Sequence, residues 1–337
     1  MINTIRLING SDLFKKMKSI IRFIVIICLL LFNNCSKETE LEIPYSGDKM
    51  VVKSLLFPDQ TVKVELSKSR PLDSLDSVIT HYITDANIKF YENDIYIEDL
   101  VYNHHYVSPS GYICKAGSEY SIYIHHDNFG SAEASVTIPD PVPIKVVDTF
   151  SVNIFYKFRA VEETIILSGL KSVLCTKIEI NDPLGEKNYY ILDIDIPLVI
   201  EFQVPGGYPP PGIYSVPVSY DSEEKMIDGW IGNINTPEFN VKILSAYFPD
   251  KMFNGKNFIF TIFILKELVL KSETHKIHIK LYSISEGYYY HIKSLQEWKK
   301  SKDNPFAEPV IIYSNVVNGM GLLGASSCYT DSTLVIR

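Results

Sequence analysis

The sequence predicts an all-β protein, built mainly of strands, with two β-rich domains and one helix. Between Met50 and Ile138, short runs of alternating apolar and polar residues are separated by turn residues. Alternation with a period of two is typical of strands that bury one face. Residues 285–300 differ, because their apolar residues recur at helical spacing. We therefore expect a β-sheet protein with one helix near its C-terminus.

The N-terminal segment has the order basic residues, apolar residues, cysteine and charged residues. Four basic residues lie within residues 15–22, ten apolar residues form residues 23–32, and Cys35 follows shortly after. This order is typical of a bacterial lipoprotein signal. It predicts that residues 1–34 are the signal peptide and that Cys35 is the acylated first residue of the mature chain. Ten apolar residues are too few for a bilayer-spanning helix, which needs about 17–25.

Two other interpretations of this segment remain open, an ordinary secretion signal and a membrane anchor. Residues 32–34 are Phe-Asn-Asn and fit poorly to the small residues expected before the cleavage site. Translation from Met17 instead of Met1 would give a signal of more usual length. Residues 35–48 are rich in charge and are predicted to be an unstructured tether.

The composition limits the partners of the mature chain. Residues 1–34 hold five basic residues and one acidic residue, so the rest has 27 Lys and Arg against 39 Asp and Glu, a net charge of −12. Binding of nucleic acid requires a basic surface, so no nucleic acid is expected as a partner. Anionic lipids are disfavoured for the same reason, which leaves the acyl chains on Cys35 as the attachment to the membrane.

Residues 49–140 are predicted to form the first domain. Alternating runs lie at residues 50–56, 61–66, 86–91, 120–124 and 134–138. Several short strands at this spacing, with no helical pattern between them, indicate a β-sandwich like those of immunoglobulin and fibronectin domains. Three prolines within residues 139–143 then end the pattern and mark the boundary, because proline has no backbone donor for a sheet.

Residues 141–337 are predicted to form a second β-rich domain. Strand-like runs resume at residues 144–155, 177–180 and 189–196. Residues 257–270 are apolar on both faces, which indicates a central strand. Together with residues 275–284 they are predicted to form a hairpin through the polar turn at 272–274.

The expected helix follows this hairpin. Ser283 and Glu286 have the spacing of a capping box, in which each side chain satisfies a backbone donor of the first turn. Tyr288 and Ile292 are four residues apart and would share one helix face. The helix is expected to end near Lys300, ahead of a proline.

Residues 204–214 are rich in proline and glycine and are predicted to form a loop of the second domain. Tyr208 and Tyr214 would make this loop a recognition surface, because binding residues are often carried on loops. A plain connecting loop is the alternative interpretation.

Gly319, Gly321 and Gly324 match the G-x-G-x-x-G pattern of dinucleotide sites. That pattern works only where it opens a helix inside a βαβ unit. Thirteen residues follow Gly324, which are too few for this helix and its second strand. Glycines that form a turn or permit close backbone contact are the better interpretation.

Histidine and aspartate pairs are the remaining candidates for metal or acid–base chemistry. Adjacent strand residues face opposite sides, so neither His104–His105 nor His125–His126 can chelate a metal from one strand. Asp193 and Asp195 would share a strand face, as calcium ligands, as acid–base groups or as solvated side chains. No catalytic motif is present, and no catalytic residue, cofactor or metal is expected.

The cysteines do not predict a disulfide framework. Apart from Cys28 in the signal and Cys35, the chain has Cys114, Cys175 and Cys328, an odd number without short spacing. Buried free thiols are expected, and a Cys175–Cys328 bridge in an oxidising periplasm is the alternative.

The block Asn304-Pro305-Phe306-Ala307-Glu308-Pro309 is the most specific part of a resemblance that extends over nearly the whole mature chain. The leader at residues 41–49, Ser69-Arg70-Pro71, Asp182-Pro183 ahead of Tyr189-Tyr190, and Phe253-Asn254-Gly255-Lys256 also contribute. These residues resemble the lipoproteins of domain-of-unknown-function family 4249. Asn34 before Cys35 departs from the usual lipoprotein pattern.

The resemblance implies a two-part β protein at the outer membrane, often encoded near a TonB-dependent receptor. The expected function is therefore non-enzymatic, as an accessory lipoprotein of such a β-barrel receptor in substrate capture or uptake. Residues 37–42 resemble the charged tags that direct such lipoproteins to the cell surface. The alternative is a surface adhesin or glycan-binding lipoprotein that works without a channel.

The surface of the folded protein would distinguish a receptor partner from a glycan-binding protein. A groove lined by aromatic residues would favour glycan binding, and a large apolar patch would favour a channel partner. Contacts with a receptor are expected in the second domain, at Tyr208, Tyr214, Asn304, Pro305, Phe306 and Glu308.

Overall fold

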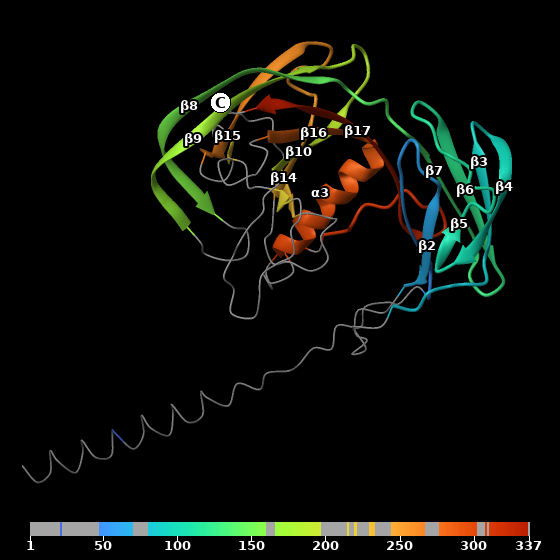
Figure 1. The fold of residues 1–337 in the computed structure, drawn as a ribbon. Coiled ribbons are helices and arrows are strands. Elements are labelled where there is room, and N and C mark those ends of the chain that lie inside the picture. The colour runs from blue at the N-terminus through green and yellow to red at the C-terminus, as the bar shows by residue number, and fades with distance from the viewer. Residues whose placement is uncertain are drawn as a thin grey trace, which may run out of the picture. The chain divides into compact units, whose positions relative to one another are not determined.

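Seventeen strands and one long helix are present in the described part of the chain. Figure 1 colours them from the N-terminus in blue to the C-terminus in red. The computed structural model describes Ile21 and residues 47–69, 80–159, 166–196, 214–215, 219–220, 229–232, 244–266, 276–301, 307–308 and 310–335. All of these elements belong to one compact unit, Gly47–Arg337. The prediction of a mainly β fold with one helix near residues 285–300 is confirmed.

Seven strands follow one another in the first part of the chain: β1 (Met50–Leu56), β2 (Lys63–Lys68), β3 (Asn87–Glu92), β4 (Ile95–Asn103), β5 (His105–Val107), β6 (Glu119–His126) and β7 (Gly130–Thr137). They pair antiparallel in the order β1-β2-β5-β4-β3-β6-β7. The predicted alternation is present in β6, where Tyr120, Ile122 and Ile124 are buried and Tyr123 is exposed.

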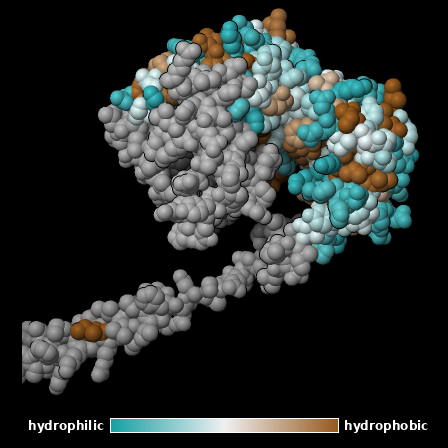
Figure 2. All heavy atoms as spheres, in the orientation of Figure 1, coloured by the Kyte–Doolittle hydropathy of each residue, from teal (hydrophilic) through white to brown (hydrophobic). Residues whose placement is uncertain are grey.

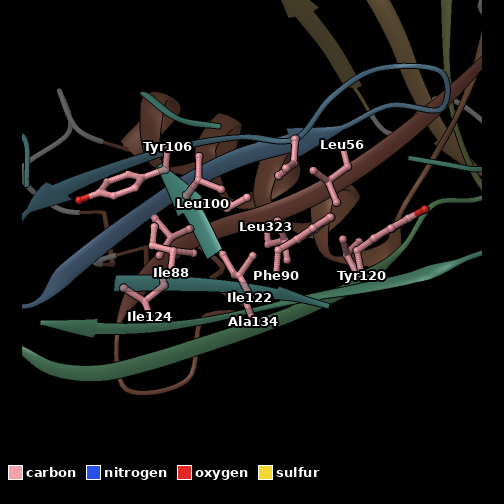
Figure 3. Close-up of a cluster of buried hydrophobic side chains, with 14 of the residues drawn as sticks. Leu56, Ile88, Phe90, Leu100, Tyr106, Tyr120, Ile122, Ile124, Ala134 and Leu323 are labelled. Carbon is pink, nitrogen blue, oxygen red and sulfur yellow. The ribbon is translucent and has the colours of Figure 1, made fainter. Parts of the chain in front are cut away.

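The core of this first part lies between two layers of strands (Figure 3). Side chains from β3, β4 and β6, such as Phe90, Leu100 and Ile122, point towards Leu56 of β1 and Leu323 near the C-terminus. All five are 4% exposed or less. Each fully buried large apolar side chain contributes roughly 1.5–3 kcal/mol to stability, so this contact between distant chain segments is a main source of stability for the sandwich.

The last strand of the chain, β17 (Met320–Val335), completes this sandwich. It pairs parallel with β1, from Val51 opposite Met320 to Leu56 opposite Ala325. Just ahead of β17, Val317 forms a bridge with Glu133 of β7. Residues more than 250 positions apart in the sequence therefore share one sheet.

Gly321 explains the glycine pattern that resembles a dinucleotide site. Its φ angle is +104°, and a Cβ there would lie 1.9 Å from the Val52 carbonyl oxygen of the neighbouring strand. Only glycine is compatible with both the angle and the contact. The pattern thus serves close packing of β17 against β1, as the close-contact interpretation predicts.

The strands of the second part of the chain belong to two sheets, of which the first is continuous with the N-terminal strands. One is formed by β13 (Gly229–Gly232), β14 (Leu244–Pro249), β10 (Tyr189–Ile196), β16 (Lys276–Ile284) and β17, in that order, with β11 (Tyr214–Ser215) beside β10. The other has the order β12 (Ser219–Tyr220), β15 (Asn257–Leu265), β9 (Ile166–Asn181) and β8 (Ile144–Arg159). Because β17 pairs with both β16 and β1, it connects the first of these sheets with the N-terminal strands.

The residues of β10 show how these layers pack. Tyr190 and Leu192 face the four-stranded sheet and share a core with Phe260 of β15. Tyr189 lies on the opposite face of β10 and shares a core with Tyr289 of α3 (Glu286–Ser301). Figure 1 shows the corresponding arrangement, with α3 on one side of β10, β14, β16 and β17, and β8, β9 and β15 on the other.

The predicted hairpin between residues 257–270 and 275–284 is wrong. β15 pairs with β9 and β12, whereas β16 pairs with β10 and β17, so the two strands lie in different sheets. Strands that are adjacent in sequence usually pair, which is why the pattern indicated a hairpin. Here the apolar face of β16, with Ile277 and Ile279, packs against the sheet of β15 instead of extending it.

The predicted capping box is also wrong, although the helix is where it was expected. Ser283 is the last but one residue of β16, and its Oγ accepts a hydrogen bond from the Val142 backbone. Glu286 accepts one from the Tyr189 hydroxyl. Both side chains make tertiary contacts that replace the local ones. In the described residues, no helix combines the length and the apolar character that a bilayer crossing requires.

Candidate functional site

Most of the residues predicted for membrane attachment and partner contacts lie outside the described residues: Cys35, Tyr208, Asn304, Pro305 and Phe306. Of the remaining two, Tyr214 opens β11, where its backbone pairs with Ile196 of β10. Glu308 is exposed. These predictions therefore stay predictions.

The histidine pairs do not combine into a metal site within the described part of the chain. His125 is exposed and lies near Asp127 and Ser131. His126, on the opposite face of β6, is buried, and its Nε2 lies 3.1 Å from an Asp85 carboxylate oxygen. The pair is thus divided between the surface and the core, as strand geometry requires.

His104 has a structural role in the chain reversal between two strands. It adopts a φ angle of +61° in the turn between β4 and β5. Asp193 accepts a hydrogen bond from the Ser245 hydroxyl at 3.2 Å, which ties β10 to β14. The described cysteines Cys114, Cys175 and Cys328 are all free; Cys114 and Cys175 are buried as expected, whereas Cys328 is exposed. The alternative Cys175–Cys328 bridge is therefore wrong.

Several residues of the resemblance meet in one place, which we call the Asp182 clasp (Asp182, Leu184, Tyr190, Asn254 and Gly255). The Asp182 carboxylate accepts hydrogen bonds from the Tyr190 hydroxyl at 2.5 Å and from the Gly255 backbone at 2.7 Å. The Asn254 side chain donates to the backbone of the β9–β10 turn. A Cβ at Gly255 would lie 3.1 Å from the Leu184 Cα. The clasp joins two turns and leaves no room for a ligand between them.

Burial dominates the electrostatics of this clasp. The pKa of Asp182 is raised, because desolvation of the carboxylate outweighs the hydrogen bonds from Tyr190 and Gly255. Burial also raises the pKa of the Tyr190 hydroxyl. Perturbed pKa values often mark catalytic sites, but here they belong to groups that are packed away from solvent.

A groove on the outer face of the N-terminal strands is the best candidate for a binding site. It has a volume of about 430 Å³ and lies on the outer side of β3, β6 and β7, beside the segment that leads into β17. Directly opposed residues on neighbouring strands point to the same face. Tyr91, Ser121 and Ser135 form one such row, and Tyr123 and Glu133 belong to the next. The small serines form the floor between larger side chains.

Two tyrosines form the aromatic side of the groove. Tyr123 is 44% exposed. Tyr91 makes an edge-to-face contact with Tyr96 of β4, with ring centroids 5.6 Å apart and planes at 71°. The Tyr96 hydroxyl donates to the Asp99 carboxylate at 3.2 Å. Contacts on β4 therefore hold the Tyr91 ring in place.

Three carboxylates border the groove, and the β3–β4 turn positions two of them. Asn93 and Asp94 both have positive φ angles, as in tight hairpin turns. The Asn93 side chain accepts a hydrogen bond from the Glu119 backbone at 3.0 Å, which fixes the turn against β6. Asp94 and Glu119 thus border the groove at this turn, and Glu133 borders it on β7.

The segment before β17 forms the opposite wall. Glu133 and Val317 exchange two backbone hydrogen bonds, of 2.8 and 3.2 Å. The Asn315 amide is bonded to both backbone groups of Leu323, at 3.0 and 2.9 Å. This wall is rigid because Asn315 is held by β17 itself.

The groove was not predicted from the sequence. Its residues come from β3, β6, β7 and the C-terminal segment, so no local motif joins them. The one available signal was the presence of Tyr91 and Tyr123 at outward positions of alternating runs, where polar side chains are expected. Figure 2 shows hydrophobic atoms in small separate groups among hydrophilic ones over the N-terminal strands.

Comparison with known protein families gives a match over most of the chain. A family model described as Domain of unknown function (DUF4249) matches residues 36–332. No curated protein matches the chain, and no solved structure does either.

Proposed function

The chain belongs to the DUF4249 family, and from this premise we propose that it is a non-enzymatic outer-membrane lipoprotein that captures a substrate for a TonB-dependent receptor. Acyl chains on Cys35 would attach it to the membrane, and residues 35–48 would tether the folded unit. In this proposal the chain needs no cofactor.

The observation that carries this proposal is the position of Cys35. The family match begins at residue 36, directly after the cysteine that ends the basic and apolar segment. A signal peptide that ends at residue 34 would leave the family region intact behind an acylated cysteine. Residues 37–42, with two basic or acidic side chains in each half, support display on the cell surface.

Binding accounts for the described residues better than catalysis. Several groups with raised pKa values, such as Asp182, Tyr190 and Cys114, are buried in packing contacts. The groove beside Tyr91 and Tyr123 is open to solvent and lined by aromatic and polar side chains that a ligand can reach.

A shared membrane would make weak binding to a receptor sufficient. When both partners are held in one membrane, their effective concentration rises without any new contact. Tyr208, Tyr214 and the residues Asn304, Pro305, Phe306 and Glu308 are the contacts that we propose for the receptor.

Replacement of Cys35 by alanine tests the anchor. We expect the variant to lose acyl labelling and to leave the membrane fraction. The control is Cys328→Ala, which removes an exposed free thiol from the folded unit and should leave both properties unchanged. Persistent acylation of Cys35→Ala would contradict the proposal.

In-cell crosslinking tests the partner. Crosslinks should join the second part of the chain to a TonB-dependent receptor, and deletion of residues 206–212 should weaken them without loss of folding. The alternative function is a surface adhesin or glycan-binding lipoprotein without a channel, which the tyrosine-lined groove also fits. Crosslinks that reach only glycans or other cells would favour that alternative.

A further inference from the structure

We propose that the groove between Tyr91, Tyr123 and the Asn315–Val317 segment binds a neutral saccharide. The inference deepens the proposed capture function by naming a substrate class. It rests on the proposed function in one respect, namely that the bound saccharide is the captured substrate. Binding of the saccharide itself is a property of the folded unit and does not depend on a receptor.

The aromatic side of the groove suits the faces of sugar rings. The C–H groups of a pyranose carry a small positive charge, and the face of an aromatic ring is negative, so the two stack favourably. Tyr123 offers an exposed ring, and its hydroxyl has no partner in the described part of the chain. Tyr91 is held by its edge-to-face contact with Tyr96, so little conformational entropy would be lost on binding.

The polar side of the groove suits hydroxyl groups. Asp94, Glu119 and Glu133 form no side-chain hydrogen bond and no ion pair with any described residue. Hydrogen bonds from a hydroxyl to a carboxylate are stronger than those between neutral groups. Ser121 and Ser135 on the floor add donors and acceptors on a surface that small side chains leave hollow.

Charge excludes another class of saccharide. Three carboxylates border the groove, and no lysine or arginine is among its lining residues; Lys89 lies on the same face, opposite Tyr123, outside the lining. A phosphate, a sulfate or a uronic acid would be repelled by all three. We therefore expect neutral saccharides to bind and acidic ones to be excluded.

A peptide fits the groove less well than a saccharide. Peptides that bind to sheets usually add a strand and bond to unpaired backbone groups. The floor offers none, because β6 is paired along its length with β3 on one side and β7 on the other. The backbone of Glu133 is also bonded to Val317 across the groove wall.

The experiment uses the full acylated chain in a detergent without a sugar head group, since sugar detergents would occupy the groove. An array of neutral, amine-bearing and acidic oligosaccharides is screened, and hits are measured by calorimetry. Lysine-rich and arginine-rich tripeptides are included as cationic competitors. We expect binding of neutral oligosaccharides and no binding of acidic ones.

Two variants assign the binding to the groove. Tyr123→Ala should weaken saccharide binding about tenfold through loss of the stacking surface. Ser135→Tyr replaces a small hydroxyl side chain with a bulky ring that fills the floor, so it should abolish binding. The matched control is Tyr82→Ala, because Tyr82 is 56% exposed and lies outside the groove; its effect should stay within about twofold. Unchanged circular dichroism shows that each variant is folded.

A charge variant separates a saccharide from a cationic ligand. Glu133→Gln keeps an acceptor oxygen and removes the charge, so neutral saccharides should still bind. A tripeptide that binds to the wild type and not to Glu133→Gln would overturn the assignment in favour of a cationic peptide. Absence of any neutral saccharide hit, or saccharide binding that Tyr123→Ala and Ser135→Tyr leave unchanged, would also overturn it.

Receptor association is measured in the same variants, so that the two proposals fail separately. Crosslinking to a receptor should persist in Tyr123→Ala. A wild type that crosslinks to a receptor but binds no saccharide would contradict the saccharide site alone. Saccharide binding without any receptor crosslink would contradict the capture function and leave the site standing.

Discussion

At the scale of single residues, Asp182 shows how a polar group specifies the fold of the second part. Its carboxylate satisfies the Tyr190 hydroxyl and the Gly255 backbone in a site that is 8% exposed. Buried donors that lose their acceptor cost about 1–3 kcal/mol each. One contact therefore explains why Asp182, Tyr190 and Gly255, which belong to separate parts of the family resemblance, occur together.

Replacement of Asp182 by alanine is predicted to lower the free energy of unfolding by about 2–5 kcal/mol, because two donors are left unsatisfied. Asp182→Asn keeps one acceptor and should cost less. Asp140→Asn is the control, since Asp140 is exposed and should change stability by less than about 0.5 kcal/mol. Urea denaturation measures all three; equal stability of Asp182→Ala and wild type would contradict the role of the clasp.

The raised pKa of Asp182 gives this prediction a pH dependence. A carboxyl group with a pKa raised in the folded state binds more protons when folded, so it favours folding at low pH. Its contribution declines as the pH rises from the ordinary pKa of aspartate, near 3.8, through the raised value. Over that window the wild type should lose stability relative to Asp182→Asn. If the wild type instead gained stability relative to Asp182→Asn as the pH rises, burial would not be the dominant cause of the raised pKa.

At the scale of elements, α3 depends on a cluster of tyrosines. Tyr189 of β10 packs against Tyr289 of the helix with ring centroids 4.6 Å apart, and its hydroxyl donates to Glu286 in the first turn. Tyr247 of β14 makes an edge-to-face contact with Tyr289. The cluster therefore attaches the helix to two strands of the sheet.

Two neighbouring tyrosines of α3 provide a matched pair. Tyr289 is 1% exposed and Tyr290 is 39% exposed. Tyr289→Ala is predicted to lower the free energy of unfolding by about 3–5 kcal/mol, as expected for a large buried aromatic side chain. Tyr290→Ala should cost less than half as much. Thermal denaturation of both variants measures the difference, and equal losses would contradict the packing of Tyr289 into the sheet.

At the scale of the whole molecule, β17 links the two predicted domains. It is paired with β1 through residues 320–325 and with β16 through residues 326–335. Asn315 adds hydrogen bonds to Ser135 of β7 and to Leu323 of β17. The domain boundary at residues 140–141 stays a prediction, but the first sandwich includes a strand from the end of the chain.

Removal of residues 314–337 is predicted to abolish protection of the N-terminal strands as well as of β16. The truncated chain loses the parallel partner of β1 and the buried Leu323 side chain. Hydrogen exchange of the β1 and β2 amides measures this effect. A chain that retains β17 but lacks residues 206–212 is the control and should keep these amides protected. Protected β1 amides in the truncated chain would show that the first sandwich is stable alone.

The sequence alone determined the β class, most strand positions, the position of α3 and the family of this chain. Each of these depends on local periodicity or on residues that stand close together, such as Tyr120, Ile122 and Ile124 in β6. The tertiary structure alone decided which strands pair. The separation of β15 and β16 into different sheets and the joining of β1 with β17 depend on contacts between distant residues, which no local pattern contains. The groove belongs to the same category, because strand pairing brings Tyr91, Tyr123 and Val317 to one surface.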